Sequence, residues 1–136
     1  MPVSADAATL YYSNGAGDLD WANLDNWWSD SGLTVQALAL PTAGDDAYIQ
    51  ASIDVNSGGP ATVNNIYIAT NLYTNINITV SGTAIFSGSS SNGANIIGNA
   101  IFNDISDTEG TVTGNATFND TSGNAGTITG NAIFND

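Results

Sequence analysis

The sequence predicts an all-β, single-chain β-solenoid with 16-residue coils and an N-terminal capping region. Three observations predict it. Phenylalanine recurs every 16 residues, β-branched residues alternate with polar ones around it, and all three tryptophans lie within the first 28 residues. A helical fold is excluded, because no apolar i, i+3, i+4 period is present and Gly, Asn, Thr and Ser are poor helix formers.

The regular repeat is anchored on four phenylalanines, each in a segment that begins with glycine. The segments GTAIFSG, GNAIFND, GNATFND and GNAIFND start at residues 82, 98, 114 and 130. A unit this short cannot bury its own aromatic ring, whereas stacked units bury each ring between its neighbours, with a rise of ~4.8 Å per coil. The spacing therefore predicts a core stack of Phe86, Phe102, Phe118 and Phe134.

Alternation within the repeat predicts which side chains face inward. The even-numbered residues from Val112 to Phe118 fall on one face, and the odd-numbered residues from Thr113 to Asn119 fall on the other. Burying the Thr/Asn face would expose every phenylalanine, so we expect the even-numbered face to line the core.

Isoleucine occupies the position before phenylalanine in three of the repeats, at Ile85, Ile101 and Ile133. In the register above it faces outward and forms an exposed apolar stripe of the kind that marks a partner. We favour the alternative, a bulge that turns this position inward, because the glycine that opens each repeat makes a bend easy.

Polar residues also recur in columns. Asparagine side chains that stack at one-coil intervals can hydrogen-bond along a fibre as ladders. The spacing predicts two such ladders: Asn99, Asn115 and Asn131 in one, and Asn103, Asn119 and Asn135 in the other. A column of Asp104, Asp120 and Asp136 lies beside the second ladder, and like charges ~5 Å apart repel, so we expect turns that splay them, a counter-ion or screening by water.

The amino-acid composition changes along the chain, and this change divides one continuous domain into three regions. Residues 1–47 are predicted to form the N-terminal cap, residues 48–81 the degenerate first coils, and residues 82–136 the regular repeat coils, uncapped at the C-terminus. Terminal coils of a solenoid are atypical because they must cover an open core and edge. We expect either a fragment of a longer array, which we favour, or an open end that pairs with another molecule.

The residue types that are missing exclude several classes of function. The 136 residues carry 13 acids and no Lys, Arg, His or Cys, for a formal charge of −13. A zinc site of the usual kind, a thiolate nucleophile, a Ser-His-Asp triad and a phosphate clamp are thereby excluded. Nucleic acid and anionic lipid should both repel the chain. We expect no enzyme, no cofactor, no nucleic-acid partner and no direct membrane insertion.

Aromatic residues in the cap admit two interpretations. Trp21, Trp27 and Trp28 lie close to Asp and Asn residues, so their rings could form a glycan-stacking platform. The interpretation we favour is a plug over the open end of the core, since a cap must supply a large apolar area. Adjacent residues of a strand point to opposite faces, so Trp27 and Trp28 cannot both point inward.

The cap also carries weak candidates for calcium ligands, namely Asp18, Asp20 and Asp25. Calcium prefers several carboxylate and carbonyl oxygens from a flexible loop. The spacing does not follow a calcium-loop signature, however, and the repeats lack the G-G-x-G-x-D pattern of calcium-binding β-rolls. Solvated acids and Asx turns are the reading we favour, with calcium as the alternative.

Two segments carry a resemblance to a known group of proteins. The stretch from Trp21 to Trp27, WANLDNW, followed by PTAGDDAYI from Pro41 to Ile49, resembles the start of large secreted bacterial β-helical surface proteins, including autotransporter-like adhesins. The GNATFND-type array resembles the near-identical arrays of bacterial surface fibres. The resemblance implies a structural segment of an extracellular fibre or adhesin on the bacterial cell surface. Apart from the resemblance, we expect end-to-end or lateral self-association. The alternative is a module that binds glycan or calcium through its cap.

Overall fold

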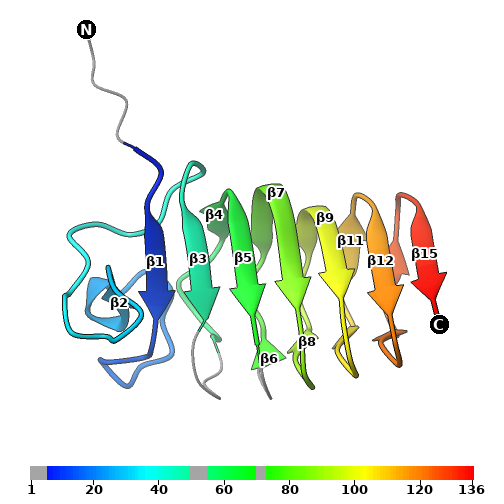
Figure 1. Cartoon of the computed structure of the whole chain (residues 1–136), viewed down its shortest axis with the longest axis horizontal. Coiled ribbons are helices and arrows are strands. Elements are labelled where there is room, and N and C mark those ends of the chain that lie inside the picture. The colour runs from blue at the N-terminus through cyan, green and yellow to red at the C-terminus, as the bar shows by residue number, and fades with distance from the viewer. Residues whose placement is uncertain (1–5, 50–54, 70–72) are drawn as a thin grey trace, which may run out of the picture.

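The computed structural model describes residues 6–49, 55–69 and 73–136, and it confirms the predicted fold class. The chain is an all-β solenoid of about 5 turns, with about 16 residues per coil. Successive coils stack along one axis, with the cap at one end (Figure 1). Nearly all strand pairs are parallel, as stacking of successive coils requires.

The longest series of paired strands forms what we call the long face. This face contains one strand from each successive coil. Its strands are β1 (Thr9–Tyr12), β3 (Asp46–Ile49), β5 (Asn65–Ile68), β7 (Ile78–Phe86), β9 (Ile96–Phe102), β12 (Ala116–Asn119) and β15 (Ala132–Asn135). Of its two longest strands, β7 and β9, only the second halves belong to it.

Two further series of strands close each coil. The short face consists of β4 (Ala61–Val63), the first halves of β7 and β9, β11 (Thr111–Thr113) and β14 (Thr127–Ile128). The third side is a four-stranded sheet of two-residue strands: β6 (Tyr73–Thr74), β8 (Ser91–Asn92), β10 (Asp107–Thr108) and β13 (Gly123–Asn124).

Coil length differs along the rod while the long face keeps its register. Asp46 pairs with Asn65, 19 residues later, and Asn65 aligns with Thr83, 18 residues later. From Asn99 onward the interval is 16 residues. The first coils are thus longer variants of the same unit, which is why the sequence period fades in this region.

The phenylalanine stack is confirmed. Phe86, Phe102 and Phe118 are fully buried. Consecutive ring centroids from Phe86 to Phe134 lie 4.9, 5.0 and 4.8 Å apart, with planes within 15° of parallel. The predicted register is confirmed as well, because Val112, Ala116 and Phe118 are buried while Thr113 is exposed. Phe134 stacks on Phe118 but is 64% exposed, so three of the four rings contribute to the buried core.

A glycine turns the corner between the short and the long face. Gly98 has φ +127° and Gly114 has φ +155°, conformations that other residues rarely adopt. A Cβ on Gly114 would collide with the carbonyl oxygen of Gly98 in the coil before. The repeat therefore needs glycine here both for backbone conformation and for close approach of the coils.

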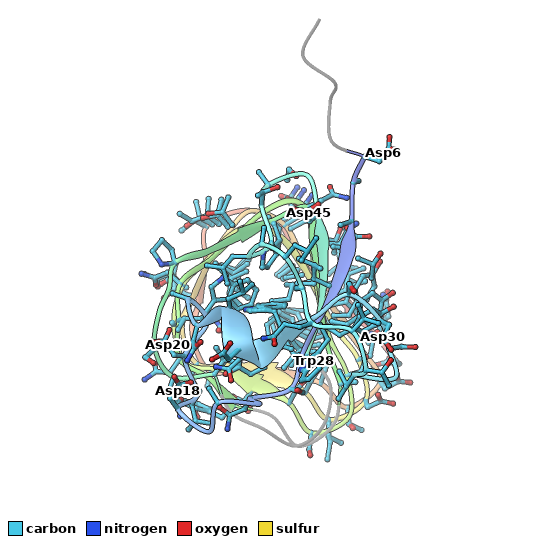
Figure 2. The ribbon with its side chains drawn as sticks, turned by 90° about the vertical axis from the view of Figure 1, so that its left-hand side faces the viewer. Asp6, Asp18, Asp20, Trp28, Asp30 and Asp45 are labelled. Atoms are coloured by element: carbon cyan, nitrogen blue, oxygen red, sulfur yellow. The ribbon has the colours of Figure 1, made fainter. Side chains whose placement is uncertain are left out.

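The cap closes the first coil with aromatic side chains. A 3-10 turn, η1 (Leu24–Asn26), leads into β2 (Trp27–Trp28), which runs antiparallel to β1. Trp27 is fully buried and Trp21 is 4% exposed, and their rings meet edge to face at 4.6 Å. The Trp27 Nε1–H donates to the Trp21 carbonyl oxygen at 2.8 Å. The predicted aromatic plug is thereby confirmed; Figure 2 shows this end of the rod.

Candidate functional site

The predicted glycan platform is wrong for two of its three rings. Trp21 and Trp27 belong to the core, so neither offers a face to a sugar. Trp28 alone is half-buried and points outward, and its Nε1–H donates to the Ser13 hydroxyl oxygen at 2.7 Å. The physical reason is strand alternation, which sends Trp27 into the core and Trp28 to the surface.

The predicted calcium candidates accept hydrogen bonds within the cap. The Asp18 carboxylate accepts from the side-chain amides of Asn23 at 2.6 Å and Asn26 at 2.7 Å, and from the backbone N–H of Asp20 at 3.1 Å. The Asp20 carboxylate accepts from the N–H of Ala22 at 2.8 Å. The Asp25 carboxylate accepts from the Gln36 side-chain amide at 3.2 Å. The bonds from the N–H groups of Asp20 and Ala22 are of the Asx-turn type, and the other bonds join side chains across the loop.

The hydrogen bonds lower the pKa of Asp18. The bond from Asn23 contributes most, followed by the bond from Asn26. Asp30 behaves similarly, since the N–H of Val35, at 2.7 Å, is the main cause of its lowered pKa. Within the described ranges, no group of three or more His, Cys, Asp or Glu residues is arranged to hold a metal ion.

An apolar groove of about 710 Å³ lies beside β1, and no pattern in the sequence predicts it. Its lining includes Leu10, Val35, Leu38 and Leu40, with Asp45 at its edge. Leu38 is 99% exposed. The Asp45 carboxylate accepts from the N–H of Thr42 and of Ala8, so it fixes the groove wall.

A continuous row of side chains, here called the outward stripe, runs along the exterior of the long face. Its members are aligned by strand pairing, one from each strand, starting in the cap. They are Trp28, Tyr11, Tyr48, Tyr67, Ile85, Ile101, Thr117 and Ile133. The interpretation that a bulge turns the isoleucine column inward is wrong. Ala84 and Phe86 are both buried, so Ile85 between them points out.

Most of the stripe is half-buried because each member covers its neighbours. Tyr48 and Tyr67 stack with centroids 4.2 Å apart and planes 15° from parallel, and Tyr11 lies 5.5 Å from Tyr48. Burial, and then the neighbouring Tyr67, raises the pKa of the Tyr48 hydroxyl. Ile133, on β15, is 51% exposed.

Both asparagine ladders form, but by different hydrogen bonds. In the first column, the side-chain oxygen of Asn99 accepts from the backbone N–H of Asn115 at 3.2 Å. The side-chain oxygen of Asn115 accepts from the backbone N–H of Asn131 in the same way. In the other column, the Asn119 side-chain amide donates to the Asn103 side-chain oxygen at 2.8 Å, and Asn135 donates to Asn119 in the same way. Only the second ladder links side chain to side chain.

Acidic residues are scarce on the strands of the long face. Asp46, the only acid in its described strands, accepts from the N–H of Asn65 and from the side-chain amides of Asn64 and Asn65. The predicted acidic column lies on turns, where Asp104 has φ 60° and Asp120 has φ 59°. The Asp104 carboxylate accepts from the N–H of Gly88 at 2.9 Å, which ties successive coils together.

A row of largely buried polar side chains on the third side was not predicted from the sequence. The Ser106 hydroxyl donates to the carbonyl oxygens of Asn103 and Phe86, and the Ser122 hydroxyl donates to that of Phe102. Thr74 donates to the Asn92 side-chain oxygen at 2.9 Å. The 16-residue spacing of Ser90, Ser106 and Ser122 was a signal for this row.

Comparison with protein-family models, with curated proteins and with solved structures found no match. Over the described part of the chain, the structure contains no helix of the length and apolarity needed to cross a membrane.

Proposed function

We propose that this chain is a structural segment of an extracellular bacterial surface fibre or adhesin, which it builds as an elongated β-solenoid. The observation that carries the proposal is the continuous core stack from Phe86 to Phe134, which can lengthen by one coil per repeat without changing the cross-section. The composition also supports it, because the chain lacks the basic, His and Cys side chains on which most catalysis depends.

Antibody labelling of cells that make the protein tests the location. Antibodies raised against this chain should label intact, unpermeabilised cells, with gold particles along surface fibres in electron microscopy. Labelling that appears only after permeabilisation contradicts the proposal.

Deletion of one repeat, residues 114–129, tests the structural role separately. The variant should keep the wild-type far-ultraviolet circular dichroism, because residues 130–136 can stack on residues 98–104 with the same GNAIFND pattern. The rod should be shorter by ~4.8 Å. Loss of cooperative unfolding in this variant would mean that the coils are not interchangeable units.

The alternative, a cap that binds glycan or calcium, has less support from the geometry. Two of the three predicted rings are buried, and the predicted carboxylates already accept hydrogen bonds from the cap. Titration of tryptophan fluorescence with soluble cell-wall glycan and with calcium tests it. A saturable change that Trp28→Phe abolishes would favour the alternative.

A further inference from the structure

The outward stripe has two halves of different chemistry. From the cap it begins with the aromatic residues Trp28, Tyr11, Tyr48 and Tyr67, and it continues with Ile85, Ile101, Thr117 and Ile133. With ~4.8 Å between strands its length is about 34 Å. We propose that the long face binds the long face of a second copy of this chain through this stripe, with the two rods antiparallel.

Charge permits two copies to meet at the long face. The chain carries 13 acids and no basic side chain, so two copies repel wherever their acids approach. The described strands of the long face carry one acid, Asp46, and the neighbouring asparagine amides already donate to it. The strands of two copies can therefore approach here with few carboxylates between them.

The short face lacks the other feature that favours an interface, a continuous row of apolar side chains. Its described strands carry no acid, one fewer than those of the long face, but its outward positions are mainly threonines, such as Thr62, Thr79 and Thr113. Ile97, 51% exposed, is the exception. A lone exposed isoleucine is ordinary on a protein surface, whereas a continuous apolar stripe marks an interface.

The antiparallel arrangement follows from the order of residues along the stripe. A two-fold axis between β5 and β7 places Tyr67 of each copy opposite Ile85 of the other, and Tyr48 opposite Ile101. Such an interface is isologous, since the same patch serves on both subunits. It also separates the two caps, which carry Asp18 and Asp20 (Figure 2), because the caps then lie at opposite ends of the dimer.

The stacked tyrosines favour a protein partner over a glycan. The faces of Tyr48 and Tyr67 cover each other at 4.2 Å, so the stripe presents ring edges to the outside. A sugar ring stacks on an exposed aromatic face, whereas ring edges and isoleucine methyls pack well between apolar side chains of a second sheet.

The size of the stripe predicts modest affinity. Three outward columns about 7 Å apart give a face about 20 Å wide. The contact would cover roughly 600–700 Å² per copy, somewhat below the ~800 Å² of a standard stable interface. We therefore expect a reversible dimer in the micromolar range or weaker for this chain, with affinity that increases as coils are added.

Sedimentation velocity over a concentration series tests the interface, with Thr117→Glu as the disruptive variant. Thr117 faces outward in the stripe, and a carboxylate there would meet the apolar stripe of the partner. The matched control is Thr113→Glu, which adds the same charge in the same coil but on the short face. We expect wild type and Thr113→Glu to dimerise alike, and Thr117→Glu to weaken the dimer at least tenfold with an unchanged melting temperature.

Cross-linking tests the orientation, since the chain has no cysteine of its own. Thr83→Cys places a thiol on β7 beside the proposed axis, and Asn131→Cys places one in the last coil, far from it. A short bismaleimide should join two Thr83→Cys chains and should not join two Asn131→Cys chains. Equal cross-linking of both variants overturns the antiparallel arrangement.

Two further outcomes overturn the interface itself. One is a monomer at every concentration up to the millimolar range. The other is a monomer that pellets with an insoluble glycan in a manner abolished by Thr117→Glu, which would make the stripe a glycan surface. The inference rests on the proposed function, because lateral pairing is what joins such rods into a fibre. Dimerisation is measured on the purified chain, whereas cell-surface exposure is measured on cells. Failure of the dimer interface is therefore distinguishable from failure of the proposed function.

Discussion

The ring of Phe118 lies over the ring of Phe102 in the coil before it, with centroids 5.0 Å apart and planes 8° from parallel. The two residues are 16 positions apart in sequence, and both are buried. Their contact spans one coil of the solenoid, so its loss should reduce the stability of the whole rod.

Phe118→Ala should destabilise the chain strongly. Removal of a fully buried ring leaves a gap between Phe102 and Phe134, and such a change costs about 3–5 kcal/mol in the free energy of unfolding. The matched control is Thr117→Ala, one residue away on the outside, which should cost less than about 1 kcal/mol. Urea denaturation of both variants measures the difference; a Phe118→Ala cost under about 1 kcal/mol would mean that Phe118 does not face the core.

Gly114→Ala should destabilise the corner between the two faces. Gly114 has φ +155°, and an added Cβ would collide with the carbonyl oxygen of Gly98. We expect a cost of about 1–3 kcal/mol. Gly123→Ala is the control, since its Cβ would meet nothing closer than the Asp107 Cβ at 3.9 Å and should change stability by less than about 1 kcal/mol. Equal thermal midpoints for the two variants would contradict the corner geometry.

The two asparagine ladders should respond differently to aspartate. Asn119 donates to Asn103 and accepts from Asn135, so Asn119→Asp loses a donor. The Asn115 side chain serves only as an acceptor in its ladder, from the N–H of Asn131, and Asn115→Asp keeps that bond. Both variants add one negative charge. We expect Asn119→Asp to cost about 1 kcal/mol more in chemical denaturation, and a reversed order would contradict the assigned bonds.

The Asp18 carboxylate should stabilise the cap in a pH-dependent way. Its folded-state pKa is lowered by the bonds from Asn23 and Asn26, so its contribution is present above the unfolded carboxyl pKa of about 3.9 and is lost as pH falls through the folded value. Asp18→Asn should lower the melting temperature at pH 7, and its gap from wild type should close below about pH 4.

Asp6→Asn provides the control for this titration, because it removes the same charge from an exposed residue outside the cap loops. The difference in melting temperature between Asp6→Asn and wild type measures how much the loss of one negative charge reduces repulsion among the acids. A gap between Asp18→Asn and wild type that stays constant from pH 7 to pH 2.5 would show that Asp18 has no special role.

The regular repeat made much of the fold predictable. A fixed interval placed Phe86, Phe102, Phe118 and Phe134 in one stack, and alternation around Ala116 and Phe118 set the register. Strand alternation also predicted that only one of Trp27 and Trp28 points inward, although sequence alone did not show which one.

Other features depend on contacts between residues whose pairing the sequence alone does not predict. Ile85 faces outward because the corner lies further upstream, between Thr79 and Thr83, where the register shifts. Tyr11 and Tyr48 join the same stripe only through pairing of β1 with β3, whose spacing does not follow the repeat. The groove beside β1 arises from loop conformations in the cap, where no period constrains the chain.

Contacts between the phenylalanine rings test the central claim most directly. The chain has four phenylalanines, so selective labelling gives a simple nuclear magnetic resonance spectrum that single Phe→Leu variants can assign. The stacked solenoid predicts nuclear Overhauser contacts from Phe86 to Phe102, from Phe102 to Phe118 and from Phe118 to Phe134, and none between Phe86 and Phe118. Absence of these sequential contacts in the folded chain, or contacts that skip a coil, would contradict the account.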